Sequence, residues 1–285
     1  MKLKDKVAII TGAGRGIGKA IALAFAREGA DVVAVARTLH EIERTATEVR
    51  ALRRIALSKK VNVSNWENVI GMVNSVINEV GKIDILVNNA GVQGSIGPLV
   101  HNDITQWINT IHTNLIGTFL CTRAVLPLMV KQKRGKIINL SGGGATTPLP
   151  YFSAYAASKA AVVRLTETVA EEVKEFNIQI NAIAPGAVNT HMLEEILAAG
   201  DLAGQRALTE ARRRRETGGV APDRAAALAV FLASDESNGL SGRLISAVWD
   251  DWQNIDRERT GGIMSQELYT LRRIDGILFS PKDKR

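Results

Sequence analysis

The chain has 285 residues, of which 46% are hydrophobic and 23% charged, a composition typical of a globular protein with room for one large α/β domain. Cys121 is the only cysteine, which excludes an intrachain disulfide or a multi-cysteine metal site and favours a reducing, cytoplasmic setting. The net charge of +7 does not predict nucleic-acid binding, because no zinc-finger spacing or aromatic platform accompanies it. We expect no signal peptide, no membrane-spanning run and no metal.

A glycine-rich turn follows the first apolar run. Residues 7–10 predict a buried strand, Gly12, Gly14, Gly16 and Gly18 come after it, and an alanine-rich helix follows. Glycines let the backbone approach a pyrophosphate, and a helix N-terminus adds free N–H groups and positive potential. This order predicts a phosphate cradle for a dinucleotide, with a ligand-free turn as the alternative.

The end of the second expected strand, residues 31–36, bears on the choice of cofactor. NAD-binding folds usually place an acidic residue there, which accepts a hydrogen bond from the ribose 2′-hydroxyl, whereas an arginine accommodates a 2′-phosphate. This chain has Arg37 at that point, and Arg15 in the glycine turn is a second cation. The two arginines favour NADP(H), with NAD(H) as the alternative.

Two further strand ends carry polar residues, where doubly wound sheets bind their ligands. After a helix over about 39–53, we expect a third strand that ends in the segment 61–64, with the sequence Val-Asn-Val-Ser. After a helix that ends at Val80, a fourth strand over 83–87 opens into residues 88–91, Asn-Asn-Ala-Gly. Such a loop is well placed to flank a cofactor ribose, although asparagine and glycine are also common in plain turns.

Asn114 lies between two helical stretches within residues 107–129. An asparagine in an apolar helix costs stability unless its amide is satisfied, so Asn114 has either a special role or a capping role.

Tyr155 and Lys159 follow a fifth strand over 136–140 and a loop with three consecutive glycines, 142–144. Their four-residue spacing places both on one face of a helix. A nearby ammonium lowers the pKa of a phenol, which is otherwise about 10, toward the range that acid/base chemistry needs. The pair alone is weak, because a packed tyrosine and a solvated lysine produce the same pattern.

The last third of the predicted domain begins with a sixth strand over 178–184, which a Pro185-Gly186 turn ends. Residues from about 190 to 219 predict a mobile lid with flexible, glycine-bearing turns. A helix over 222–234 and a last strand over 242–247 follow. The run Arg212 to Arg215 predicts a solvated helix face; the alternative is attraction of a phosphate-bearing or carboxylate substrate.

Together the glycine turn, Asn-Asn-Ala-Gly, Tyr-x-x-x-Lys and Pro-Gly resemble the short-chain dehydrogenase/reductase family, in order and spacing, over nearly all of residues 7–247. The resemblance implies an α/β fold: a single-domain, Rossmann-type, doubly wound parallel sheet with helices on both faces, spanning 1–248. It also implies an NAD(P)-dependent oxidoreductase that interconverts a secondary alcohol and a carbonyl. The alternative is a non-catalytic sensor or scaffold that binds a dinucleotide.

The same resemblance assigns roles to residues. Tyr155 passes a proton to or from the substrate oxygen, Lys159 binds the ribose and lowers the tyrosine pKa, and Asn114 holds a water that links the lysine to solvent. Asn62 stands where an aspartate often contacts the adenine. The implied cofactor-binding residues are Gly12, Arg15, Gly16, Ile17, Gly18, Arg37, Asn62, Val63, Asn89, Ala90, Gly91, Tyr155, Lys159, Pro185, Gly186, Val188 and Thr190.

One departure concerns the catalytic serine, because the position thirteen residues before Tyr155 is Gly142. Ser141 is one residue early, and adjacent side chains of an extended chain point to opposite faces. Either the loop bends so that Ser141 serves as the catalytic hydroxyl, or backbone N–H groups of 142–144 replace it, or substrate hydroxyls supply the bond.

A second departure is the C-terminal extension, 249–285, which is too apolar for a disordered tail. We expect its first part to pack over the active-site mouth or onto a neighbouring subunit, anchored by Trp249 and Trp252. The alternative is a surface groove far from the site. The expected partners are a small alcohol or carbonyl substrate, polar or sugar-like, and further copies of the chain in a homodimer or homotetramer.

Overall fold

Seven parallel strands form one sheet in the order β3-β2-β1-β4-β5-β6-β7 in the computed structural model, which describes residues 1–266 and 268–271. The order reverses between β1 and β4, the kind of point at which open α/β sheets bind ligands. The strands are β1 (Val7–Thr11), β2 (Asp31–Ala36), β3 (Ala56–Lys60), β4 (Ile85–Asn88), β5 (Gly135–Leu140), β6 (Ile178–Ala184) and β7 (Leu244–Ser246).

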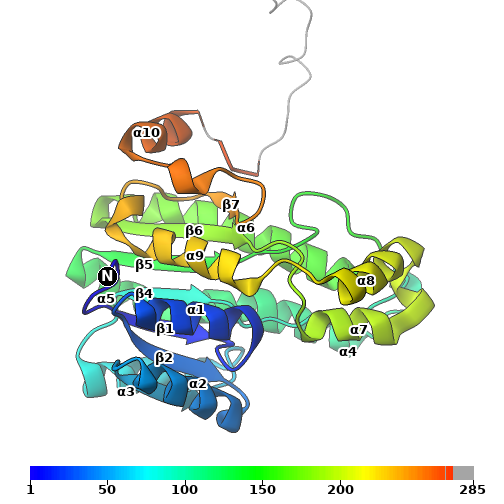
Figure 1. Cartoon of the computed structure of the whole chain (residues 1–285), viewed down its shortest axis with the longest axis horizontal. Helices are drawn as coiled ribbons and strands as arrows, with labels where there is room; N and C mark the ends of the chain where they lie inside the picture. The colour runs from blue at the N-terminus through cyan, green and yellow to red at the C-terminus, as the bar shows by residue number, and fades with distance from the viewer. Residues whose placement is uncertain (267, 272–285) are drawn as a thin grey trace, which may run out of the picture.

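Helices cover both faces of the sheet (Figure 1). Helices α1, α2 and α9 share one apolar core with the sheet, whereas α3 and α5 share the other. The helices are α1 (Gly16–Arg27), α2 (Leu39–Ala51), α3 (Trp66–Val80), α4 (Ile104–Ile111), α5 (Gly117–Gln132), α6 (Ser153–Glu172), α7 (His191–Ala199), α8 (Gln205–Thr217), α9 (Pro222–Ala233) and α10 (Arg257–Ser265). This is the Rossmann-type, doubly wound fold that the sequence predicts.

Strand β1 illustrates why an apolar run becomes a central strand. All five of its residues are buried. Ala8 and Ile10 pack into the first core, and Val7 and Ile9 into the second, because successive side chains of a strand point to opposite faces. A strand covered on both faces therefore needs a continuous apolar run rather than an alternating one.

The third strand ends earlier than the sequence suggests. The expectation that it ends in residues 61–64 is wrong, because β3 stops at Lys60. Its neighbour β2 stops at Ala36, whose carbonyl accepts a hydrogen bond from the backbone N–H of Val61, and no partner strand continues beyond that point within the described chain. Val61 and Val63 are buried, but the Asn62 side chain accepts from the Ser64 N–H at 3.1 Å and turns the chain.

Asn114 lies in a π-helical turn, His112–Ile116, that joins α4 to α5. The resulting continuous helix, Ile104–Gln132, is long and apolar enough to cross a membrane by length and composition alone, which corrects the expectation of no such run. In its most apolar window 44% is buried inside the protein, and Cys121, Val125 and Met129 are core residues. A core helix of a folded domain meets the same criterion.

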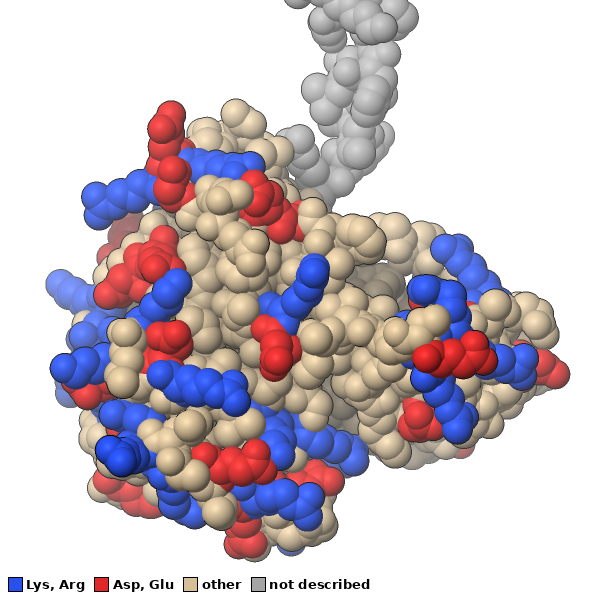
Figure 2. Space-filling model, in the orientation of Figure 1, with Lys and Arg blue, Asp and Glu red and all other residues tan. Residues whose placement is uncertain are grey.

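The region of the expected lid forms two helices, α7 and α8, joined by the short helix Gly200–Ala203, and Gly200, Gly204 and Gly218 lie at the ends of these helices with positive φ. Both helices lie beyond the carboxyl ends of the central strands (Figure 1). Figure 2 shows positive and negative side chains interspersed over the visible face, including the α8 region, with no large patch of one sign.

The C-terminal extension runs along the edge of the sheet beside β7. The Leu244 N–H donates to the Tyr269 carbonyl at 2.8 Å, and the Leu271 N–H donates to Glu167 on α6 at 2.6 Å. Trp252 packs against Phe231 of α9, with ring centroids 5.9 Å apart, whereas Trp249 is 85% exposed. Of the two predicted anchors, only Trp252 is packed against other residues in the part of the chain that the structure describes. The rest of the extension, 272–285, lies outside the described residues.

Candidate active site

The glycine turn between β1 and α1 has the geometry of a phosphate cradle. Gly12 and Gly16 have φ values of +66° and +55°, which favour glycine. A Cβ on Gly18 would lie 2.3 Å from the Gly12 carbonyl oxygen, so helix and turn touch at that point. Helix α1 has no side-chain cap and no acidic residue in its first turn. Its first N–H groups and its positive end are therefore free to meet a pyrophosphate.

Thr11 and Asn89 join this turn to the loop after β4. The Thr11 hydroxyl accepts from the backbone N–H groups of Asn89 and Ala90, both at 3.0 Å, and donates to the Val87 carbonyl at 3.3 Å. The Asn89 amide donates to the carbonyls of Thr11 and Gly12, at 2.9 and 3.2 Å. The predicted Asn-Asn-Ala-Gly loop is therefore hydrogen-bonded to the glycine turn.

A cavity of about 820 Å³ runs over the carboxyl ends of the central strands. Its walls contain most of the predicted site residues, which are Gly12, Arg15, Gly16, Ile17, Arg37, Asn62, Val63, Asn89, Ala90, Gly91, Ser141, Tyr155, Lys159, Pro185 and Thr190. Four predicted residues do not line it. Gly18 packs beneath the glycine turn, Asn114 lies behind Gly91, and Gly186 and Val188 pack near Val220.

Helix α6 brings Tyr155 and Lys159 into this cavity on one face. The Lys159 ammonium donates to the Leu140 carbonyl at 2.8 Å and lies 5.6 Å from the centre of the Tyr155 ring. Burial lowers the pKa of Lys159 to about 8 and raises that of Tyr155 to about 12. Desolvation disfavours the charged form of each group. The pKa of Tyr155 is therefore raised, which corrects the expectation that the neighbouring ammonium lowers it.

Asn114 anchors helix α6 to the loop after β4. Its amide oxygen accepts from the Val92 N–H at 2.9 Å, and its amide nitrogen donates to the Val92 carbonyl and to the Ser158 hydroxyl, both at 3.0 Å. A Cβ on Gly91 would lie 3.2 Å from the Asn114 oxygen and 3.6 Å from the Lys159 nitrogen. The amide is thus satisfied within the π-helical turn, next to the lysine.

Ser141 and Gly142 lie differently toward the tyrosine. The buried Ser141 hydroxyl donates to the Lys159 carbonyl at 3.4 Å, which ties strand β5 to α6. A Cβ on Gly142 would lie only 2.4 Å from the Tyr155 hydroxyl oxygen. The backbone at 142 therefore occupies the space beside the phenol, where a serine side chain would not fit without moving the tyrosine.

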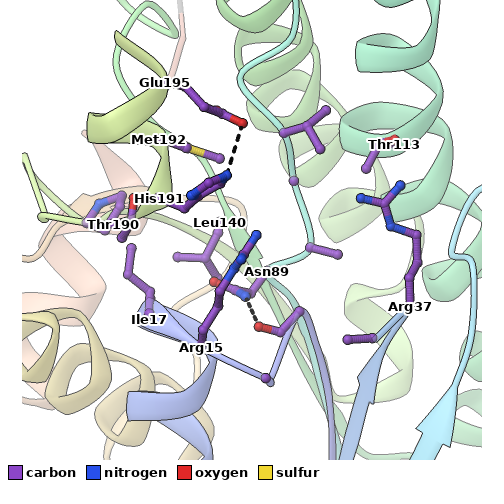
Figure 3. A pocket seen from close by; sticks show the side chains of 18 of the residues that line it. Arg15, Ile17, Arg37, Asn89, Thr113, Leu140, Thr190, His191, Met192 and Glu195 are labelled. Carbon is purple, nitrogen blue, oxygen red and sulfur yellow. Dashed lines mark hydrogen bonds and ion pairs between the residues drawn. The ribbon is translucent and has the colours of Figure 1, made fainter. Parts of the chain in front are cut away.

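Two arginines line the other end of the cavity. Figure 3 shows the Arg15 side chain rising from the glycine turn and the Arg37 side chain from the end of β2. Arg15 forms a 3.6 Å ion pair with Glu41 of α2. Across the cavity, the first turn of α7 contributes Thr190, His191 and Met192.

Several lining residues are absent from the sequence prediction, among them Thr38, Glu41, Val92, Thr113, Leu140, His191 and Met192. Arg215 also lines the cavity, and it belongs to the arginine run for which attraction of a phosphate-bearing or carboxylate substrate is the alternative. Most lie next to predicted residues in the chain, so a wider window around each motif finds them. Glu41 is different, because its approach to the glycine turn depends on how α2 packs. No sequence signal indicates it.

The family model of the short chain dehydrogenases matches residues 6–200, and this range contains every residue that lines the cavity except Arg215. The chain belongs to the short-chain dehydrogenase/reductase family. It is 37% identical over 246 residues to the 3-oxoacyl-[acyl-carrier-protein] reductase FabG of Thermotoga maritima, covering 86% of this chain and 97% of that protein. It is 38% identical over 243 residues to the 3beta-hydroxysteroid dehydrogenase 1 of Eggerthella lenta, covering 84% of this chain and 91% of that protein.

Solved structures agree with this assignment. A crystal structure of NAD+-bound xylitol dehydrogenase superposes with a TM-score of 0.81 at 30% identity, covering 86% of this chain and 98% of that one. Carveol dehydrogenase from Mycobacterium avium, in complex with NAD, has a TM-score of 0.77 at 27% identity, over 86% and 96% of the two chains. This short-chain dehydrogenase/reductase is an oxidoreductase that acts on CH–OH or carbonyl groups with a nicotinamide cofactor.

Proposed function

We propose that the protein is an NADP(H)-dependent oxidoreductase that interconverts a secondary alcohol and a carbonyl, with Tyr155 as the acid/base. One arrangement carries the proposal: a single cavity is lined both by the Tyr155–Lys159 pair, which follows β5, and by the cations Arg15 and Arg37, which follow β1 and β2 across the sheet. An arginine after β2 suits a 2′-phosphate. Relatives bound to NAD make the preference between the two cofactors the point to test.

The chain's own residues would position the reactants and move one proton. The glycine turn and the N-terminus of α1 would bind the pyrophosphate, and residues 89–91 would flank a ribose. The bound nicotinamide supplies the hydride chemistry. In carbonyl reduction Tyr155 donates a proton to the substrate oxygen, and it removes that proton in alcohol oxidation. Lys159 contributes positive charge that offsets the desolvation of the phenolate.

The substrate oxygen would be held without the usual serine. Gly142 and Gly143 donate no hydrogen bond from their backbone N–H groups to any residue among 1–266 and 268–271. Gly142 lies beside the Tyr155 hydroxyl, directly after Ser141 at the end of β5. The Ser141 hydroxyl faces the backbone of α6 instead. Among the three alternatives set out above, this geometry favours backbone donors from the glycine run, because such donors are aimed before the substrate arrives.

The remaining parts of the proposal concern the lid, the substrate and assembly. Tyr151 is 42% exposed and packs against Gly204, which lies between α7 and α8; a Cβ on Gly204 would lie 2.4 Å from the Tyr151 ring. We infer that α7 and α8 form a lid that covers the substrate.

We expect a polar, sugar-like substrate in a cytoplasmic enzyme. The exposed apolar side chains of Ile104, Ile108 and Phe119 support a homodimer or homotetramer.

Cofactor preference is tested by titrating the wild-type protein and the Arg37→Asp variant with NADPH and NADH. We expect the wild type to bind NADPH more tightly and the variant to lose that preference. Arg44→Asp is a matched control, because Arg44 is an exposed arginine on α2 that does not line the cavity. An unchanged ratio of dissociation constants in Arg37→Asp would refute the role of Arg37.

Catalysis is tested with a panel of alcohols and carbonyl compounds and the Tyr155→Phe variant. We expect turnover to fall by about 10² to 10⁴ while cofactor affinity is retained, because the phenol serves proton transfer. Tight cofactor binding without turnover of any compound, and with no effect of Tyr155→Phe, would instead support the sensor or scaffold alternative.

A further inference from the structure

We propose that Glu41 is a specificity-determining residue that lowers the preference of this protein for NADP(H) over NAD(H) by competing with the 2′-phosphate for Arg15. The inference rests on the proposed function, in which Arg15 and Arg37 receive that phosphate. It adds an anionic side chain at the phosphate end of the cavity, so that cofactor choice depends on a balance of charges.

Glu41 lies against the glycine turn. A Cβ on Gly14 would come within 2.7 Å of the Glu41 Cβ and 2.8 Å of a Glu41 carboxylate oxygen. The other carboxylate oxygen lies 3.6 Å from an Arg15 guanidinium nitrogen. The Glu41 side chain is 27% exposed and that of Arg15 is 63% exposed. The absence of a side chain at Gly14 is what permits this approach of α2 to the turn.

The position of Glu41 in α2 would allow it to cap the start of its own helix, but it does not do so. Thr38 is the N-cap of α2 and Glu41 is three residues later, the spacing of a capping box. In a capping box the glutamate bonds back to the N-cap N–H, and the threonine hydroxyl bonds to the N–H of the third residue. Neither bond is present: Thr38 makes no side-chain cap bond, and Glu41 turns toward Arg15 instead.

A dinucleotide with a 2′-phosphate would meet both charges. The phosphate and the Glu41 carboxylate are both acceptors for the Arg15 guanidinium, and the two anions repel each other at close range. Binding of NADP(H) therefore has to break or share the Arg15–Glu41 pair. NAD(H) has a neutral hydroxyl at that position, so it escapes the competition. Glu41 thus weakens one cofactor selectively.

The test compares Glu41→Gln with wild type by calorimetric titration of the purified protein with NADPH and NADH, at low and high salt. Glutamine keeps the packing over Gly14 and removes the charge. We expect the dissociation constant for NADPH to fall about fivefold, because the variant no longer has the exposed Arg15–Glu41 ion pair that NADPH must break. The dissociation constant for NADH should be unchanged. The gain shrinks at high salt, because exposed charges are screened. Glu43→Gln is the matched control, because Glu43 is an exposed glutamate on the same helix that does not line the cavity.

Each other outcome overturns the inference. Equal tightening of both cofactors, or the same gain in Glu43→Gln, would mean a general effect of net charge. Weaker binding of both would mean that Glu41 only supports the turn. The proposed function fails separately: Arg15→Ala and Arg37→Asp would then leave NADPH binding unchanged. If Arg15→Ala weakens NADPH binding but Glu41→Gln changes nothing, the inference alone is wrong.

Discussion

The Gly142 backbone and the Tyr155 hydroxyl are so close that a Cβ at 142 would lie 2.4 Å from the phenolic oxygen. Tyr155 therefore occupies space that a side chain at 142 would need. In this chain the glycine at 142 does more than remove a serine hydroxyl, because the position of the Tyr155 phenol depends on it.

Restoring the family's serine is expected to lower activity. In Gly142→Ser the new Cβ displaces the phenol, and a misplacement of about 1 Å can cost up to about 100-fold in rate. We expect kcat/KM to fall about 10- to 100-fold. Gly143→Ala is the control, because a Cβ at 143 meets nothing within 4 Å and its φ is not in the left-handed region. A Gly142→Ser enzyme as active as wild type would show that the tyrosine adapts.

The rate of carbonyl reduction should fall as the pH rises above about 8. Burial lowers the pKa of Lys159 to about 8, so the lysine loses its positive charge above that pH. The uncharged lysine no longer favours the phenolate that forms when Tyr155 donates its proton. The pH profile of kcat/KM, which reports the free enzyme, shows this limb. In Lys159→Met we expect a much lower rate without the limb near pH 8; retention of the limb would assign it to another group.

A second buried lysine should make stability depend on pH. Lys136 donates to Ser237 and Asn238, at 3.1 and 2.9 Å, and burial lowers its pKa to about 8. In the unfolded chain its pKa is about 10.4, so between these values the unfolded state binds more protons and the free energy of unfolding rises with pH.

We expect this rise to reach up to about 2 kcal/mol for Lys136 between pH 8 and 10. Lys159 contributes in the same direction, so Lys136→Met should roughly halve the total increase rather than abolish it. Urea unfolding at pH 8 and pH 10 measures the difference. An identical increase in the wild type and in Lys136→Met would contradict a lowered pKa of Lys136 in the folded protein.

Removal of the C-terminal extension should affect stability more than catalysis. A chain that ends at Asp250 keeps the bond from the Ser246 N–H to the Asp250 carboxylate, at 2.7 Å. It loses the acceptor for the Leu244 N–H at the sheet edge and the contact of Trp252 with Phe231. We expect a lower Tm and more aggregation, because a bare edge strand pairs with other chains. A large change in KM at unchanged Tm would instead place the extension at the active-site mouth.

The sequence is sufficient for those features that local pattern determines. The apolar run of β1, the glycine spacing after it and the Tyr155–Lys159 spacing each lie within a short segment. The structure buries the β1 run in the core and places the glycine turn, Tyr155 and Lys159 in the wall of one cavity. The end of β3 is different, because Val61 and Val63 continue an apolar alternation past the point where β2 supplies a partner. A strand needs a neighbour as well as a pattern.

Contacts between distant segments are the part that the sequence does not reveal. Glu41 reaches the glycine turn through the packing of α2, and the Leu140 carbonyl accepts from Lys159 because β5 lies beside α6. Likewise the apolar character of the extension indicates that it packs, but its place along β7 depends on which edge the domain leaves open.

The hydroxyl of Thr11 joins two stretches of backbone that are almost eighty residues apart in the chain, at the centre of the sheet. These hydrogen bonds connect the glycine turn and the loop after β4, so we expect the two segments to keep a fixed position relative to each other. We therefore expect exchange of the cofactor to leave the arrangement of β1 and β4 unchanged. On the proposal that α7 and α8 cover the substrate, we expect motion during turnover to involve these two helices rather than the glycine turn.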